Sequence, residues 1–168
     1  MPAAGQQAGA GNHSVRSFWV TEAGYSYSTT GGCSDHYPSF EVGKLINLGG
    51  SFAAGGSAFV GHNGDLLFGP RPRLRYWASD DVAFDFGAGL LFGARRSRPA
   101  GLASVTYRDV MSLVVQYERN RDGACGQPIE NQVFLGVKIG SRPGVTTALV
   151  GTAIAGIMIW YFVSQVEN

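Results

Sequence analysis

Apolar and polar residues alternate along the chain from residue 17 to residue 141, in segments that glycine-rich or polar stretches separate. Alternation with a period of two is typical of β-strands whose two faces meet different surroundings. The pattern predicts eight strands, at residues 17–28, 38–48, 51–61, 67–77, 82–92, 101–107, 110–118 and 132–141. The Asn-Gly pair within 62–65 predicts a hairpin turn, whereas Pro70 and Pro72 indicate that the fourth strand starts at an edge or a bulge.

The predicted connections after the second, fourth and sixth strands are short, whereas those after the first, fifth and seventh are longer. Short turns and long loops therefore gather at opposite ends, as in an antiparallel up-and-down β-barrel. We expect a mainly β chain with three parts: a flexible N-terminal arm at 1–16, a barrel of about eight strands at 17–141, and one C-terminal transmembrane helix at 143–166.

The C-terminal segment 143–166 contains no charged residue. In a helix, residues 145–163 would extend over roughly 28 Å, close to the hydrocarbon thickness of a bilayer. A buried core helix is the alternative, but a strand-rich chain of 168 residues offers little that could enclose it. Small residues on one face predict packing against another helix: Ala148, Gly151, Thr152, Ala155 and Gly156. Aromatic residues near the far end predict a membrane interface: Trp160, Tyr161 and Phe162.

The two faces of the predicted strands differ in polarity. On the fifth strand, Phe84 and Phe86 share one face and Asp85 lies on the other. In lipid, the apolar face would point outward around a polar lumen, whereas in water it would fill the interior. Lys44 lies in phase with apolar residues of the second strand, and a lysine at mid-membrane depth on a barrel costs about 2–4 kcal/mol. We therefore expect a water-facing barrel that lies on the membrane surface beside its own helix.

The runs 71–92 and 104–120 combine this alternation with aromatic residues at strand ends. They resemble the small eight-stranded outer-membrane β-barrels of Gram-negative bacteria, over roughly residues 17–141. The chain differs from that family in its added C-terminal helix and in a first segment that we do not expect to be a signal peptide. The resemblance implies an antiparallel barrel in contact with lipid.

Lys138 and Arg142 precede the predicted span, and no basic residue follows it. The positive-inside tendency then places the barrel at the cytoplasmic face of a bacterial inner membrane, in a single-pass protein. Cys33 and Cys125 fall in loops at the same end of the barrel, where a disulfide between them would require an oxidising compartment. Two separate thiols are the alternative. The periplasmic face and the outer membrane therefore stay open as other locations.

Few residues suggest chemistry. Cys33, Asp35 and His36 share one loop, but catalytic groups are normally assembled from distant segments on rigid elements, so we interpret this cluster as a polar loop. Some barrels of the resembled family act on lipid A with a serine and a histidine near the rim, which would leave Ser34, His36 and His62 as candidates. The histidines and cysteines lack paired spacing for a metal, and we expect no enzymatic activity and no cofactor.

Three arginines line one face of the fourth predicted strand: Arg71, Arg73 and Arg75. They could contact an anionic partner, or they could form a network with carboxylates such as Asp85 and Glu118. A net charge of +1 gives no electrostatic reason to expect nucleic acid as a partner.

The helix with its small-residue face and the lack of catalytic groups favour a noncatalytic accessory subunit. We expect it to brace a larger membrane complex, for example a respiratory or photosynthetic assembly, with membrane lipid and other transmembrane subunits as partners. One alternative is an outer-membrane barrel that serves as a structural protein or a narrow channel. A barrel-type enzyme that acts on lipid is the other alternative.

Overall fold

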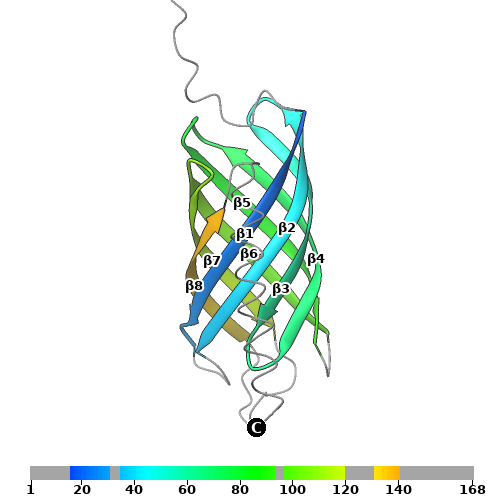
Figure 1. The fold of residues 1–168 in the computed structure, drawn as a ribbon, viewed down its shortest axis with the longest axis vertical. Helices are drawn as coiled ribbons and strands as arrows, with labels where there is room; N and C mark the ends of the chain where they lie inside the picture. Colours follow the sequence, from blue (N-terminus) through cyan, green and yellow to red (C-terminus); the bar gives the residue numbers. More distant parts are fainter. Residues whose placement is uncertain (1–15, 31–34, 94–96, 120–130, 141–168) are drawn as a thin grey trace, which may run out of the picture.

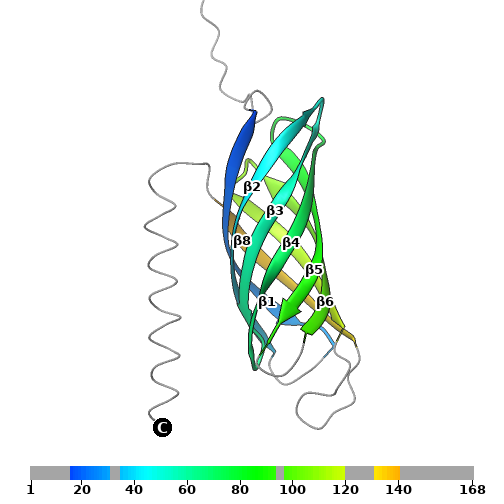
Figure 2. The ribbon, with the colours of Figure 1, turned by 90° about the vertical axis from the view of Figure 1, so that its right-hand side faces the viewer.

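The computed structural model describes residues 16–30, 35–93, 97–119 and 131–140, which form eight antiparallel strands closed into one barrel (Figure 1). The strands are β1 (Ser17–Ser28), β2 (His36–Gly49), β3 (Phe52–His62), β4 (Leu66–Trp77), β5 (Val82–Phe92), β6 (Ser97–Tyr107), β7 (Met111–Arg119) and β8 (Asn131–Gly140). Each strand pairs with the next, and β1 closes the barrel against β8. The strands incline to the barrel axis, as closure of a sheet requires (Figure 2).

The predicted eight-stranded barrel is confirmed. The bounds of β1 and β5 are those predicted, and most other strand ends differ by one or two residues. The largest difference is in β6, which begins at Ser97 rather than at residue 101. Pro99 lacks a donor and interrupts the alternation there, yet it still lies opposite Leu90 of β5.

The predicted C-terminal helix and all of the predicted N-terminal arm except Arg16 lie outside the described residues. The helix-packing and interface residues assigned to 143–166 therefore stay predictions. No helix among the described residues has the length and apolar character needed to cross a bilayer.

The two ends of the barrel carry different connections. At one end, here called the turn end, residues 50–51, 78–81 and 108–110 join consecutive strands. At the other, the loop end, the connections are 29–35, 63–65, 93–96 and 120–130. β1 begins and β8 ends at the turn end, which is at the top of Figure 1. Gly64, in the predicted Asn-Gly turn, has the positive φ of 66° that such a turn requires.

The turn between β6 and β7 has an unusual backbone. Arg108 and Asp109 both have positive φ, 54° and 56°, in the pattern of the tight hairpin turn that normally prefers asparagine and glycine. The Val110 amide donates to the Tyr107 carbonyl at 3.0 Å and closes the turn. The Arg108 side chain pairs with Asp81 in the neighbouring turn, and this hydrogen bond raises the Arg108 pKa. The Asp109 carboxylate accepts a hydrogen bond from Arg75 at 2.8 Å. Contacts of the two side chains therefore hold a backbone shape that their residue types disfavour.

The prolines of β4 mark neither an edge nor the one register shift recorded in the barrel. The shift lies between β2 and β3, at Asn47 and Gly49. Pro70 and Pro72 lie opposite Ala58 and Gly56 of β3 without a shift. Toward β5, no ladder pair is recorded between Phe68 and Arg73, the stretch that contains both prolines. The prolines therefore interrupt the pairing on one side of β4, but without a bulge, and β4 is not an edge strand because closure gives every strand two neighbours.

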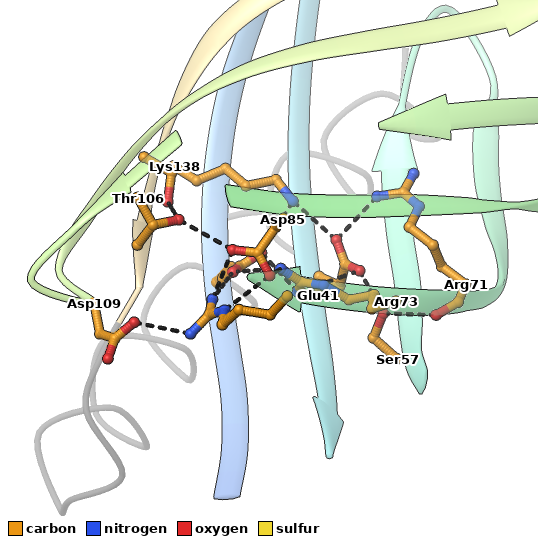
Figure 3. A network of polar contacts seen from close by, with 11 residues as sticks. Glu41, Ser57, Arg71, Arg73, Asp85, Thr106, Asp109 and Lys138 are labelled. Atoms are coloured by element: carbon orange, nitrogen blue, oxygen red, sulfur yellow. Dashed lines mark hydrogen bonds and ion pairs between the residues drawn. The ribbon is translucent and has the colours of Figure 1, made fainter. Parts of the chain in front are cut away.

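The interior has three layers. A cluster of buried apolar side chains fills the turn end: Phe18, Val20, Leu45, Ala53, Trp77 and Ala83. A second one fills the loop end: Tyr37, Phe59, Leu67, Leu91, Ala100 and Phe134. Between them lies a layer of buried charged side chains from β1, β2, β4, β5 and β8 (Figure 3). The polar face of the alternating pattern therefore lines the lumen.

Candidate functional site

The two faces of each strand lie in opposite surroundings. Asp85 is 0% exposed, whereas its neighbour Phe86 is 50% exposed. The same contrast separates Arg73, at 3%, from Leu74, at 42%. The apolar face points outward, so our expectation of a water-facing barrel with an apolar interior is wrong.

Lys44, which led to that expectation, lies on the outer wall near the middle of β2, where it pairs with Gly56 near the middle of β3. It lies opposite Trp19, the third residue of β1, and its Nζ is 5.9 Å from the centroid of the Trp19 ring. On a membrane barrel, the cost of an outward lysine falls to about 0–1 kcal/mol near an interface, where its long side chain can reach the headgroups. In a wall that faces lipid, Lys44 near mid-height is a cost, which its contact with the Trp19 ring and the reach of its side chain only partly offset.

Outward-facing aromatic side chains form two belts on the wall. The belt near the turn end consists of Trp19, Phe52, Tyr76, Phe84 and Tyr107. Its rings are adjacent in places, with centroids 4.9 Å apart for Phe52 and Tyr76 and 6.5 Å apart for Tyr76 and Phe84. The belt near the loop end consists of Tyr25, Tyr27, Phe68, Phe92 and Tyr117. Paired aromatic belts flank the apolar band of membrane barrels.

Arg73 is the centre of the charged layer in the lumen. Its two terminal nitrogens bind both carboxylate oxygens of Glu22, at 2.9 and 3.0 Å. The same guanidinium group lies 3.1 Å from Asp85 and 3.6 Å from Glu41. Lys138 joins the network from β8, with Nζ 3.0 Å from Glu22 and 2.9 Å from Glu41. Five strands, β1, β2, β4, β5 and β8, are thus tied together across the interior (Figure 3).

Arg75 extends the network toward the turn end. It binds Asp85 through two nitrogens, at 2.9 and 2.8 Å, and a third nitrogen lies 2.8 Å from Asp109. Asp109 belongs to the β6–β7 turn, so its carboxylate enters the lumen from that end. A cavity of about 10 Å³ lies beside Arg75, Thr106 and Ser112, room for about one water molecule.

Arg71 lies on the loop-end side of Arg73 and has fewer partners. One terminal nitrogen donates to Glu41 at 2.9 Å, and the guanidinium lies over the Phe59 ring, 4.1 Å from its centroid. Its Nε and Nη2 find no hydrogen-bond partner among the described residues. Glu41 also accepts a hydrogen bond from Ser57, so this carboxylate keeps other partners besides Arg71.

A second, smaller polar group lies toward the loop end. Glu118 accepts hydrogen bonds from Tyr37 and, at 2.9 Å, from Gln116. Arg98 contributes a nitrogen 3.8 Å from the same carboxylate. Tyr37 also stacks edge-on against Phe134, with centroids 4.8 Å apart, and so connects this polar group to the apolar cluster at the loop end.

The lumen is therefore filled by matched charges. The central network places four cations, Arg71, Arg73, Arg75 and Lys138, opposite four carboxylates, those of Glu22, Glu41, Asp85 and Asp109. Buried charges are tolerated when they are paired and hydrogen-bonded. With apolar clusters above and below, this arrangement can hold the barrel closed and fix the register of its strands.

The three arginines proposed as contacts for an anionic partner all point into the lumen. Their side chains are 0–4% exposed and are bound by carboxylates of the chain itself, so an external anion does not reach them. The arginines instead form an internal network with carboxylates, the alternative that the sequence left open, and Asp85 is one of its members. The sequence did not single out Glu22, Glu41 or Asp109 as members.

The other candidate residues lie at the loop end or outside the described residues. Cys33, Ser34 and Cys125 lie outside the described residues, so the disulfide and the loop cluster stay untested. His36 is the first residue of β2 and bonds through Nδ1 to the Tyr25 hydroxyl on the outer wall. His62 is the last residue of β3. Within the described parts of the chain, no group of three histidine, cysteine, aspartate or glutamate residues could hold a metal.

No protein-family model matches the chain, and no curated protein matches it. Several solved structures are similar to it, including the following three. A structure from the de novo design of transmembrane β-barrels has 17% identity, a TM-score of 0.44 and coverage of 74% of this chain and 95% of its own. The Yersinia pestis outer membrane protein Ail, in a phospholipid bilayer nanodisc, has 10% identity, a TM-score of 0.47 and coverage of 74% and 99%.

The third structure is the designed protein TMB2.3, with 16% identity, a TM-score of 0.44 and coverage of 82% of this chain and 100% of its own. At these identities and TM-scores, the likenesses do not bear on what this chain does.

Proposed function

We propose that this chain is a membrane-spanning β-barrel of the outer-membrane type, a structural protein whose interior is sealed by ion pairs. One observation carries the proposal: the faces of the strands have reversed burial, with charged side chains inside and apolar side chains outside. A water-soluble barrel would expose its charges and bury its large apolar residues. A barrel in lipid requires the arrangement found here.

The outer wall supports a position within a bilayer. Large apolar residues are exposed on every strand, among them Leu113 at 64%, Ile139 at 62% and Leu135 at 50%. Soluble monomers rarely expose contiguous apolar surface of this extent. The strands are 9–14 residues long, and about 9–11 inclined residues suffice to cross the hydrocarbon core. The two aromatic belts lie where the headgroups would be.

An outer-membrane barrel could serve as a structural protein or as a narrow channel. The filled lumen favours the structural role. A channel needs a continuous polar path, whereas apolar clusters close both ends of this interior. Between them, the guanidinium and carboxylate groups bind one another at 2.8–3.1 Å. An ion would have to separate these pairs in order to pass.

The accessory subunit of an inner-membrane complex is less well supported. That expectation combined a water-facing barrel with a helical anchor, and the first of these is wrong. The anchor lies outside the described residues. We retain the absence of enzymatic activity as part of the proposal, and a test of lipid hydrolysis with Ser34, His36 and His62 replaced would examine it directly.

Reaction of single cysteines with a charged maleimide tests the membrane position. In protein with Cys33→Ser and Cys125→Ser, Leu135→Cys places a thiol on the outer wall in the middle of β8, and Asp80→Cys places one in an exposed turn. In lipid vesicles, we expect Asp80→Cys to react and Leu135→Cys to be protected. Equal reaction of both thiols in the folded protein would overturn the proposal.

Conductance across a planar bilayer tests the sealed interior. We expect no steady current from the unmodified protein, because both ends of the lumen are closed. A stable ohmic current would overturn the structural role in favour of a narrow channel, while leaving the membrane position intact.

A further inference from the structure

The outer wall has an apolar depression over β4 to β7, with a volume of about 590 Å³. Small outward-facing residues form its floor: Ala88, Gly101 and Ala103. Larger apolar residues border it, including Leu74, Phe86 and Val115. Figure 2 shows β4, β5 and β6 side by side in this part of the wall.

Gly101 in this floor is not required by the packing of the barrel. A Cβ placed there would meet no atom nearer than the Gly87 carbonyl oxygen, at 4.0 Å. At Gly69 and Gly89, by contrast, a Cβ would lie 2.1 and 2.3 Å from backbone oxygens of the neighbouring strand. Glycine inside a strand reduces stability. A strand glycine that the packing of the barrel does not require is typical of a site where another backbone approaches closely.

The chain carries a segment that could approach in this way. Residues 143–166 follow the end of β8 at Gly140, which lies at the turn end. β6 is two strands away from β8, or roughly 10 Å along the wall. Residues 141–144 can extend over at most about 14 Å, which is enough to bring the segment alongside the depression.

The sequence of this segment complements the depression. It has no charge, and its predicted small face contains Gly151, Thr152 and Ala155. Two surfaces of small residues allow a helix backbone to approach closely in a membrane, where packing drives association. A helix from the turn end would also bring Trp160 and Tyr161 to the level of the aromatic belt at the loop end, since about 19 helical residues match the apolar height of a barrel.

We infer that residues 143–166 form a helix that lies lengthwise against β5 to β7, with the small face seated in this depression. The inference rests on the proposed membrane-spanning barrel. It makes the segment a ninth element of the same molecule rather than an anchor for a different one. The depression would then be covered by the chain itself instead of by lipid or a second copy.

Disulfide formation between engineered cysteines tests the inference, in full-length protein with Cys33→Ser and Cys125→Ser. Ala103→Cys is combined with Gly151→Cys or Ala155→Cys, because these positions should lie at similar distances from the turn end. Ala103 is four inclined strand residues from the end of β6, a rise of about 9 Å, and Gly151 is six helical residues from residue 145, which is also a rise of about 9 Å. The control replaces Ala103→Cys by Ala23→Cys on β1. Ala23 also faces outward, between Phe40 and Ile139, as Ala103 does between Phe86 and Val115.

We expect intramolecular crosslinks from Ala103→Cys in severalfold higher yield than from Ala23→Cys, identified by mass spectrometry of the linked peptides. Equal yields, or a higher yield at Ala23→Cys, would place the segment elsewhere and overturn the inference. Crosslinks between two molecules at Ala103→Cys would overturn it as well, because a second copy would then occupy the depression. If Leu135→Cys is protected in the same vesicles while these crosslinks fail, the docking is wrong and the membrane position stands.

Filling the depression gives an independent measurement. Gly101→Cys with Ala155→Cys should crosslink, since the Gly101 position has room for a side chain. Adding Ala103→Leu should lower this yield severalfold, because the leucine occupies the space assigned to the helix. Adding Ala23→Leu should leave the yield unchanged. An equal effect of the two leucines would contradict the proposed seat of the helix.

Discussion

The lumen and the outer wall of this barrel are built by the same eight strands, yet each follows a different rule. Neighbouring residues such as Arg73 and Leu74 lie on opposite sides of one sheet, with 3% and 42% of their surface exposed. Inside, the charged groups are mostly paired with one another, although two nitrogens of Arg71 have no partner among the described residues. Outside, large apolar side chains are exposed. In the proposed membrane-spanning barrel, the alternation therefore reflects a charged lumen on one side and hydrocarbon on the other.

The two regions also differ in how a single charge is accommodated. In the lumen, Arg73 contacts three carboxylates from three other strands. On the wall, Lys44 lies near the middle of β2 beside the Trp19 ring. A charge in the lumen is therefore kept by oppositely charged partners, whereas the charge on the wall has an aromatic neighbour and a long side chain that can reach toward the headgroups. Substitutions that exchange these conditions should reveal the difference.

Arg73→Met should have the largest effect. Without this guanidinium, Glu22 keeps only Lys138 and Arg75 as cationic partners, and the second of these is 3.8 Å away. Removing one partner of a buried ion pair costs about 3–5 kcal/mol, because the other charge stays buried. We expect a loss of this size in the free energy of unfolding, measured by urea titration in lipid vesicles with tryptophan fluorescence as the signal.

Arg71→Met is the matched control, since Arg71 lies two residues away on the same face and is equally buried. Its carboxylate partner Glu41 keeps Lys138 and Ser57, so the loss should be clearly smaller. Equal losses for the two variants would contradict the central position of Arg73. A neutral Arg73→Met would show that the network does not hold the fold.

Leu135→Arg should have the next largest effect, because it places a charge in the middle of the outer wall. On membrane barrels, arginine at mid-depth costs about 2–4 kcal/mol and nearly nothing at the interfaces. On the same strand, Ile139→Arg lies near the turn end and should cost only about 0–1 kcal/mol. Unfolding in vesicles measures both. If the two variants lost equal stability, depth in a membrane would not explain the apolar wall.

Most of the fold could be predicted from the sequence, because alternation specifies strands wherever the two faces differ. Its success is clearest in β5, where Phe84, Asp85 and Phe86 alternate without interruption. Alternation cannot show which face points inward. A period of two shows which residues share a face of the strand, but either face could line the interior. Lys44 lies near the middle of β2, as assumed, so the error was to let one lysine outweigh the many charged residues on the opposite face.

The site was predictable only in part. The arginines of β4 stood out because three of them share one face, and Asp85 is a near neighbour along the hairpin. Glu22 and Lys138 are 116 residues apart and meet only because β1 pairs with β8 at a particular register. A sequence signal did exist, since isolated acidic residues lay in otherwise apolar strands. Without the register, however, their partners could not be identified.

The smallest effect should come from the β6–β7 turn. There, the Arg108 side chain makes an exposed contact outside the barrel, whereas the Asp109 side chain enters the lumen. Arg108 and Asp109 both have positive φ, so glycine relieves backbone strain of about 1 kcal/mol at either position. Arg108→Gly loses an exposed ion pair with Asp81 and an exposed contact with the Tyr107 ring. Exposed contacts of this kind contribute little, so we expect a small gain in stability. Asp109→Gly removes the carboxylate that binds Arg75 at 2.8 Å inside the lumen.

We therefore expect Asp109→Gly to lower the urea midpoint, although it relieves the same backbone strain as Arg108→Gly. Asp109→Asn should separate the two contributions, since it tolerates positive φ and keeps a hydrogen-bond acceptor but removes the charge. Its midpoint should lie between those of the unmodified protein and Asp109→Gly. If both glycine variants shifted the midpoint in the same direction by similar amounts, the turn would respond only to its backbone. Asp109 would then have no part in closing the lumen.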